Sequence, residues 1–398
     1  MIAEIMIATL LGILTGIFTG LIPGIHINLV SVLMLSFSAF LLSIASPLIL
    51  AVYIIAMSIT HSFLNVLPAV FLGAPESSDN ILTVLPGHRM LLQGKAYEAI
   101  LLTVIGSFLA IIIGIILTPL LLMFLPKMYN GLNNYIPYIL LIVVFFLIFR
   151  EKQKLVSLFI FLLAGVFGLI VLNLNIKNPL FPLLSSLFGV AGLLVSLKDN
   201  IKIPPQIIDK IHIPKLDALK AVSSASIVGT FVSILPGLGP AEAAIIGSQI
   251  TKLTDKGFLI LVGALDTLGM VVSFIAIVSI EKARNGSVIT ISKLMETISI
   301  NDLYLFLLIA FLSGVVSIFL TMRLTKVFSK LISKVNYQKL SISIIILILT
   351  MTFFLSGFLG LFILIIGSFI GMLPPLFGIG RNHLMGCLLI PVILFFLL

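Results

Sequence analysis

Apolar residues along this chain of 398 residues are gathered into long runs separated by short polar segments. A helix needs about 20 apolar residues to cross the hydrocarbon core of a membrane. Runs near or above that length occupy residues 47–72, 99–125, 135–149, 155–172, 179–197, 258–280, 302–322 and 340–373, the last being long enough for one span and part of another. None of them keeps up the polar–apolar alternation that is typical of a half-buried strand. The pattern predicts an all-α polytopic membrane protein, with roughly 10–12 transmembrane segments once broken stretches are included.

Charged residues are too few to cover a water-facing surface. Lys and Arg number 23 and Asp and Glu 14, which together make 9% of the chain, while 60% is hydrophobic. A soluble domain usually carries about a quarter charged residues. The composition therefore excludes soluble cytosolic and disordered classes, and it predicts a multi-pass protein of the cell membrane surrounded by lipid. The single cysteine, Cys387, excludes an internal disulfide and a cysteine-based metal cluster.

The net charge of +9 comes from Lys and Arg placed in short loops between apolar runs. This placement is typical of membrane insertion with the basic loops inside, and it does not indicate nucleic-acid binding. The rule predicts that four basic segments are cytoplasmic: 85–98, 150–154, 198–220 and 323–339. The remaining connections, 126–134, 173–178 and 281–301, are then expected outside.

Two apolar stretches, 2–46 and 221–251, are broken in the middle by Pro-Gly, and residues 16–24 align with residues 229–237. Because five spans separate them, two stretches that each return to their starting side would enter the membrane from opposite sides. This indicates two re-entrant hairpins in an inverted repeat, an arrangement typical of secondary transporters. The alternative is that Pro-Gly kinks two ordinary spans. We expect a first transmembrane half at 1–198, a cytoplasmic linker at 199–220 and a second half at 221–398.

A Pro-Gly break ends one half-helix and begins another, whose free N–H groups and dipole favour an anion. His26 and Asn28 follow the first break, and Gly239, Pro240 and Glu242 follow the second. His26 is as consistent with a packed, hydrogen-bonded residue, and Glu242 with the cytoplasmic surface. The candidate substrate residues at the two breaks are Pro23, Gly24, His26, Asn28, Pro236, Gly237, Gly239 and Pro240.

Acidic residues inside or beside apolar runs are the candidates for binding a coupling cation. Asp266 lies within an apolar run, where an ionised carboxylate is costly unless it is paired or protonated. It is expected to bind Na⁺ or H⁺, or else to make a structural hydrogen bond to another helix. Glu242 is a second candidate, and the polar loop 73–80 adds Glu76 and Asp79 beside the hydroxyls of Ser77 and Ser78. Such a loop is also what a water-exposed turn looks like.

The sequence lacks the motifs of metalloproteases, P-loop ATPases and serine hydrolases. ATP-driven transport by this chain alone is therefore excluded, and we expect no enzyme, no metal site and no cofactor beyond a coupling Na⁺ or H⁺.

Several motifs give the chain a resemblance to a known family. They are Gly-Leu-Ile-Pro-Gly at 20–24, Ala-Pro-Glu-Ser-Ser at 74–78, Pro-Gly-His-Arg-Met at 86–90, Gln-Gly-Lys-Ala at 93–96 and Ser-Ile-Leu-Pro-Gly-Leu-Gly-Pro at 233–240. With them the chain resembles the large permease subunit of tripartite tricarboxylate transporters. The resemblance implies that Ser77 and Ser78 belong to a substrate-binding loop, and that a small membrane subunit and an extracytoplasmic binding protein are partners. The paired breaks are also distantly similar to those of polyprenyl-phosphate transporters.

The sequence as a whole predicts a secondary-active permease for a small organic anion, a di- or tricarboxylate, coupled to a cation and working by alternating access. Translocation of a polyprenyl phosphate or another lipid phosphate is the alternative. A membrane enzyme acting on a lipid head group is a third possibility.

Overall fold

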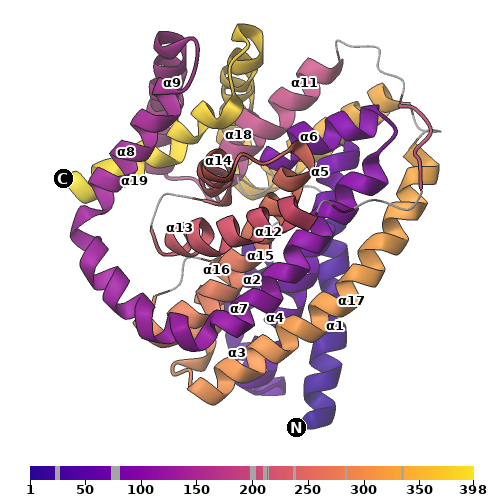
Figure 1. Ribbon diagram of the computed structural model, residues 1–398, viewed down its shortest axis with the longest axis vertical. Helices are drawn as coiled ribbons and strands as arrows, with labels where there is room; N and C mark the ends of the chain where they lie inside the picture. The colour runs from indigo at the N-terminus through magenta and orange to yellow at the C-terminus, as the bar shows by residue number, and fades with distance from the viewer. Residues whose placement is uncertain are drawn as a thin grey trace.

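The computed structural model describes residues 1–22, 27–72, 81–197, 203–208, 213, 215–235, 239–282, 285–332 and 336–398 (Figure 1). The described residues form helices and connecting segments, with no strand among them. The first half holds α1 (Ile2–Leu21), α2 (Ile27–Ser36), α3 (Ser38–Ile44), α4 (Pro47–Leu64), α5 (Val66–Leu72), α6 (Ile81–Leu92), α7 (Ala96–Leu132), α8 (Ile136–Phe149), α9 (Lys154–Asn173), α10 (Leu180–Leu184) and α11 (Ala191–Leu197). The second half holds α12 (Lys215–Ser224), α13 (Thr230–Ile234), α14 (Pro240–Thr251), α15 (Asp255–Ile280), α16 (Gly286–Met295), α17 (Ile300–Ile332), α18 (Tyr337–Phe377) and α19 (Gly386–Leu397).

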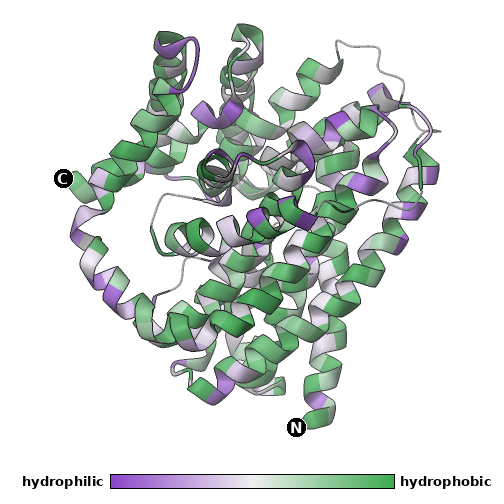
Figure 2. Cartoon of the chain, in the orientation of Figure 1, coloured by the Kyte–Doolittle hydropathy of each residue, from purple (hydrophilic) through white to green (hydrophobic). Residues whose placement is uncertain are grey.

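Eight described helices are long and apolar enough to cross a membrane, and four shorter apolar helices accompany them. Apolar residues cover most of the helical surface (Figure 2). On α1, for example, Leu10, Leu14 and Phe18 are all more than half exposed. Such a surface is stable only in lipid. The protein is therefore an all-α, multi-pass membrane protein, as the sequence predicts.

The tightest helix contact joins α7 of the first half to α15 of the second. Gly106 lies against the backbone of Ile260, and Gly263 lies against the carbonyl of Thr103, so neither position has room for a Cβ. The hydroxyl of Ser107 donates to the carbonyl oxygen of Gly263 at 3.0 Å. Small residues let two backbones approach closely, which is how helices gain dispersion energy in lipid. Glu98 pairs with Lys256 near the start of the two helices, and Gly114 meets Val271 further along, so α7 and α15 run parallel.

A second tight contact joins α1 to α4. Gly12, Gly16 and Gly20 follow one face of α1 and lie successively against residues 53–57, 57–60 and 61–64 of α4. The glycines serve close packing, and the two helices run parallel. On the other side of α4, α17 also runs parallel to it, with Ser317 donating to Thr60 at 3.2 Å.

The directions of these helices show that the two broken stretches start from opposite ends of the molecule. Helices α7 and α17 run antiparallel. Phe306, near the start of α17, packs against Phe274 toward the end of α15, which is parallel to α7. Phe328, near the end of α17, stacks on Phe71 beside α6, whose Arg89 pairs with Asp255 at the start of α15. Helices α12 and α13 run parallel to α15, with Asp217 beside Gly257 and Gly229 beside Leu265. The stretch that begins with α12 therefore runs antiparallel to α1, as the odd number of intervening spans predicts.

The second broken stretch returns to the end from which it started. Beyond the break, α14 passes back along α12, with Gly247 against the hydroxyl of Ser224. At the end of this return, Thr254 caps α15 and its hydroxyl bonds the carboxylate of Asp217 near the start of α12. The stretch is thus re-entrant.

The long run at 340–373 lies in α18, which consists of two helical limbs. Helix α18 folds back at Gly357, whose φ of 67° and ψ of −163° suit only glycine. At the fold, Ser356 donates to the carbonyl of Asn178 at 3.3 Å. The two limbs pack beside the helical stretch from α10 to α11, while α19 packs on α9 with Gly168 against Cys387.

Polar segments gather at the end of the molecule where α7, α12 and α15 begin, which we call the inner end. The backbone N–H of Ala96 donates to Oε1 of Gln206 at 3.0 Å, and Ile207 donates to the carbonyl of Gly94 at 2.8 Å. Ion pairs join Arg89 to Asp255 and Lys256 to Glu98. These contacts bring together parts of two segments, 85–98 and 198–220, that loop charge assigns to the cytoplasm. The opposite end, where α7 and α15 finish, is called the outer end. Membrane orientation and the division at 198 and 220 stay predictions.

Candidate substrate site

Most of the residues expected to bind substrate or cation lie outside the described residues. They are Pro23, Gly24, His26, Glu76, Ser77, Ser78, Asp79, Pro236 and Gly237. Asn28 lies in α2 and Glu242 in α14, and the structure describes their backbones only. Gly239, Pro240 and Asp266 are described in full. The neighbouring helices nevertheless show what surrounds each break.

Helix α1, which ends just before the first break in the sequence, shares a buried polar cluster with α4 and α17. Thr19 is 1% exposed on the last turn of α1, and its Oγ1 lies 3.1 Å from Nδ1 of His61 on α4. Thr60 receives a hydrogen bond from Ser317, and Thr321 donates to the carbonyl of Phe63 at 3.4 Å. We call Thr19, Thr60, His61, Ser317 and Thr321 the polar seam.

The polar seam was not among the predicted site residues. In the sequence, Asn65 follows His61 by one helical turn, and it is 5% exposed in the structure. A histidine and an asparagine one turn apart in an apolar run were the signal that could have found it. Their partners on α1 and α17 are far away in the chain, so spacing alone does not identify them.

The second break is flanked by the ends of α13 and α14. Leu235 leaves α13 in an extended conformation, with φ −82° and ψ 120°. Gly239 precedes α14, and its carbonyl accepts from Ala243 at 3.1 Å, so that Pro240 occupies the first helical position. Proline is favoured there because its missing N–H is not needed. The N–H groups of the first turn of α14 thus stand at the break, as an anion site requires.

Asp266 lies near the middle of α15 and is half-buried. The face of α15 that carries it also carries Gly269 and Ser273, three and four residues apart. A Cβ on Gly269 would meet the hydroxyl of Ser233, on α13, at 3.5 Å. Asp266 is therefore about one helical turn from the point where the end of α13 meets α15. Asp266 therefore lies near the end of α13, the helix that leads into the second break, while its coupling role and the substrate role of the break stay predictions.

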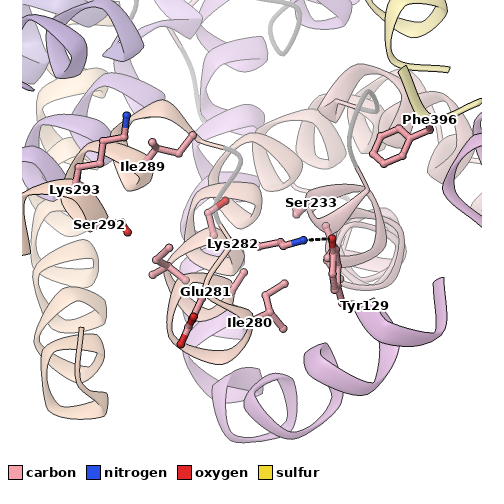
Figure 3. A pocket seen from close by; sticks show the side chains of 13 residues that line it. Tyr129, Ser233, Ile280, Glu281, Lys282, Ile289, Ser292, Lys293 and Phe396 are labelled. Carbon is pink, nitrogen blue, oxygen red and sulfur yellow. Dashed lines mark hydrogen bonds between the residues drawn. The ribbon is translucent and has the colours of Figure 1, made fainter. Parts of the chain in front are cut away.

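A cavity of about 440 Å³ opens at the outer end of the same face of α15. Its walls come from α7, α13, α15, α16 and α19 (Figure 3). Lys282 stands inside it, with Nζ donating to the hydroxyl of Tyr129 and lying 4.4 Å from the centroid of that ring. We call this space the outer cavity; it is lined by Tyr129, Ser233, Ile234, Ser273, Ala276, Ile277, Ile280, Glu281, Lys282, Ile289, Ser292, Lys293 and Phe396.

The described part of the chain contains no cluster of three His, Cys, Asp or Glu side chains that could hold a metal ion. What it offers is the ends of the helices that flank the two breaks, together with hydroxyls, a histidine and one carboxylate. Such a set can bind an anion through backbone N–H and hydroxyl groups, and a proton or monovalent cation at the carboxylate.

Comparison with protein families gives a match to the model described as the tripartite tricarboxylate transporter TctA family, over residues 6–386. The chain belongs to this family. TctA proteins are the large membrane subunits of transport systems that typically also contain a small membrane subunit and a binding protein. The resemblance suggested by the Pro-Gly motifs is therefore confirmed, and this TctA-family chain is a membrane transporter.

A similar protein is the "Uncharacterized protein MJ1079" of Methanocaldococcus jannaschii. It is 31% identical over 402 aligned residues, which cover 98% of each chain. No solved structure matches this chain.

Proposed function

We propose that this TctA-family protein is a cation-coupled secondary permease for a small organic anion, a di- or tricarboxylate. One observation carries the proposal: two helices broken by Pro-Gly start from opposite ends of the bundle, and each ends beside polar groups on a core helix. In the first stretch, Thr19 of α1 contacts His61 of α4. In the second, Ser233 of α13 lies beside Gly269, on the face of α15 that holds Asp266. Opposed broken helices with a central polar site are the arrangement by which secondary transporters bind substrate.

The breaks suit an anion because they supply positive charge without a basic side chain in lipid. The N-terminal turn of a half-helix carries about half a unit of positive charge and several free N–H donors. Two such turns facing one substrate would bind two carboxylates. In this proposal Pro23, Gly24, Pro236 and Gly237 form the helix tips. The remaining binding groups would be His26, Asn28, Ser77, Ser78, Gly239 and Pro240.

Asp266 is the proposed coupling residue. Asp266 is half-buried near the middle of a span. There the ionised carboxylate is much less stable than the protonated or cation-bound form. Its occupancy by H⁺ or Na⁺ would therefore affect the conformation and the charge of the neighbouring substrate site. Glu242, close to the second helix tip, and Glu76 and Asp79 in the loop 73–80 are further candidates for the same role.

Alternating access is supported by the unequal packing of the two ends. The outer end has the outer cavity. At the inner end, Phe71 on α5 stacks on Phe328 of α17 with 5.7 Å between ring centroids, and His88 donates from Nδ1 to the carbonyl of Val70 at 3.1 Å. A cavity thus lies at the outer end beside α15, whereas the described residues beside α5 at the inner end pack against one another. We propose that during transport the outer end closes while the inner end opens, and that the reverse change follows.

The test is uptake of labelled di- and tricarboxylates into proteoliposomes, with imposed gradients of Na⁺ or H⁺. We expect uptake that follows one gradient and is lost in Asp266→Asn, whereas Asp255→Asn at the exposed inner end keeps it. Uptake that ignores both gradients would overturn the coupling. Failure to transport any acid, with the small subunit and binding protein supplied, together with flipping of a labelled lipid phosphate, would replace the carboxylate by a lipid substrate.

A further inference from the structure

We infer that the outer cavity is an anion-binding vestibule, in which Lys282 and Lys293 collect a small carboxylate from the outer aqueous phase and hand it to the second helix break. The link to transport rests on the proposed function, whereas the attraction of anions does not. Of the described residues expected to bind substrate, Gly239 and Pro240 do not line the vestibule.

The vestibule leads toward the second break along one face of α15. Ile280, Ile277, Ser273, Gly269 and Asp266 follow one another at three- and four-residue spacing, so they lie on one stripe of the helix. The first three line the outer cavity. Gly269 is the next position inward, and the absence of a side chain there leaves space beside Ser233.

Ser233 is the point at which the vestibule meets the break. It lines the outer cavity and sits on the last turn of α13, three residues before Pro236. Its hydroxyl donates to the carbonyl of Gly229 at 2.6 Å, which leaves the oxygen lone pairs and not the proton for a ligand. An anion moving inward therefore needs donors ahead of it, and the helix tip beyond Ser233 supplies them.

The charge of the vestibule favours anions. Lys282 and Lys293 carry positive charge and Glu281 carries one negative charge, so the lining has an excess of positive charge. Lys282 is held in place by the hydroxyl and the ring of Tyr129, and Figure 3 shows its amine pointing across the cavity toward that residue. Isoleucine and phenylalanine side chains form much of the remaining wall, and apolar walls strengthen the field of a fixed charge.

The size of the vestibule fits a small solute. A volume of about 440 Å³ is in the range of roughly 300–1,000 Å³ that is usual for small-molecule sites. Three serine hydroxyls, from Ser233, Ser273 and Ser292, add polar groups to the lining. These features favour a water-soluble carboxylate of a few carbon atoms as the ligand.

Thiol labelling tests the electrostatic part of the inference without any transport. In Ser233→Cys, the new thiol is exposed to reagents added at the outer face, while the native Cys387 is fully buried and serves as an internal control. The rates of modification by sulfonatoethyl methanethiosulfonate, an anion, and by trimethylammonioethyl methanethiosulfonate, a cation, are measured and divided by their rates with a free thiol. Ser292→Cys on α16 provides a second probe in the same cavity if the first variant does not fold.

We expect the anionic reagent to be favoured, and we expect Lys282→Gln combined with Lys293→Gln to reduce that preference by about tenfold, the lower end of electrostatic steering effects. Lys127→Gln, on the exposed outer end of α7 and outside the lining, is the matched control and should leave the preference unchanged. Equal rates for the two reagents, or a preference that survives loss of both lysines, would overturn the vestibule. So would a lack of reaction at both probe positions.

Uptake measurements then test the link to the second break. In the double lysine variant the KM for the transported carboxylate should rise about tenfold with little change in kcat, because collection of the anion is impaired and the inner site is intact. An unchanged KM together with a lost thiol preference would leave a charged cavity that substrate does not use, and it would overturn the transfer step. Absence of uptake in the unmodified protein contradicts the proposed function and leaves the thiol result to stand alone.

Discussion

His61 on α4 and Thr19 on α1 meet at 3.1 Å between Nδ1 and Oγ1, and both side chains are at least 97% buried. Thr19 is the last hydroxyl of α1 before the first Pro-Gly break. The pair therefore joins the end of α1, just before the break, to α4. A polar group buried in a membrane protein needs such partners, since neither lipid nor nearby water can replace them.

Replacing His61 by alanine should destabilise the protein through the loss of this contact. The hydroxyl of Thr19 would keep only its long contact with the carbonyl of Gly16, and a buried volume would become empty, so we expect a cost of about 1–3 kcal/mol. Thermal unfolding in detergent measures the loss. The matched control is Thr350→Ala, an outward-facing hydroxyl on α18 that bonds only the carbonyl of Ile346 within its own helix; it should be within error of the parent. Equal stability of the two variants would contradict the prediction.

Gly106→Val should separate α7 from α15. The new side chain would collide with the backbone of Ile260, and backbone cannot move aside as a flexible side chain can. Overpacking of this kind costs about 1–3 kcal/mol or more. Gly131, near the end of the same helix, has open space around it and gives the matched control, since Gly131→Val meets nothing. The melting temperature of Gly106→Val should therefore be lower than that of Gly131→Val, and equal melting temperatures would contradict the prediction.

Gly357→Ala should destabilise the hairpin of α18 for a purely conformational reason. No atom lies close enough to obstruct a Cβ at this position, yet φ is +67° and ψ −163°. Residues other than glycine pay about 1–3 kcal/mol in this region. We expect Gly357→Ala to lower the melting temperature and Gly131→Ala to preserve or raise it. A neutral effect of Gly357→Ala would show that α18 does not turn at this residue.

Acid should weaken the contact of α6 with the end of α5. Burial lowers the pKa of His88 below its usual value, with the hydrogen bond to the carbonyl of Val70 acting in the opposite direction. The folded protein therefore favours neutral His88, and the unfolded chain binds more protons just below the usual pKa of about 6.5. Stability is complete above that pH and falls as the pH drops toward the lowered pKa. Melting temperatures between pH 7.5 and about pH 5 measure this loss.

His88→Gln is the control for that pH dependence. Glutamine cannot take up a proton, and its amide can still donate to the carbonyl of Val70. The variant should lose the part of the acid sensitivity that His88 causes. If parent and variant lose stability equally between the two pH values, His88 is not the responsible group.

The apolar runs were sufficient to predict the spans, because about 20 apolar residues have few alternatives to a membrane helix. The opposed directions of the two broken stretches followed from counting spans. The fold of α18 was only half predicted, since Gly357 lies in an uninterrupted apolar run and its backbone conformation is not visible in composition. The contacts of the polar seam were not predicted either, because they join α1, α4 and α17.

The outer cavity illustrates the same limit. Tyr129 and Lys282 lie 153 residues apart in the chain and meet only because α7 and α15 run in parallel and end together. In the sequence, Lys282 is one of several basic residues in a loop. No spacing rule distinguishes it from a lysine that faces water.

The glycine contact between α7 and α15 has a mechanical consequence. One of these helices belongs to each half of the chain, and their backbones touch at Gly106 and Gly263 with no side chains between them. Such a joint resists sliding, because any shift would drive a carbonyl into the neighbouring backbone. Helix α17 of the second half is also bound to α4 of the first, there through the hydroxyls of Ser317 and Thr60. A close backbone contact among the described helices therefore joins the two halves of the chain, and α7 and α15 would have to move together in any conformational change.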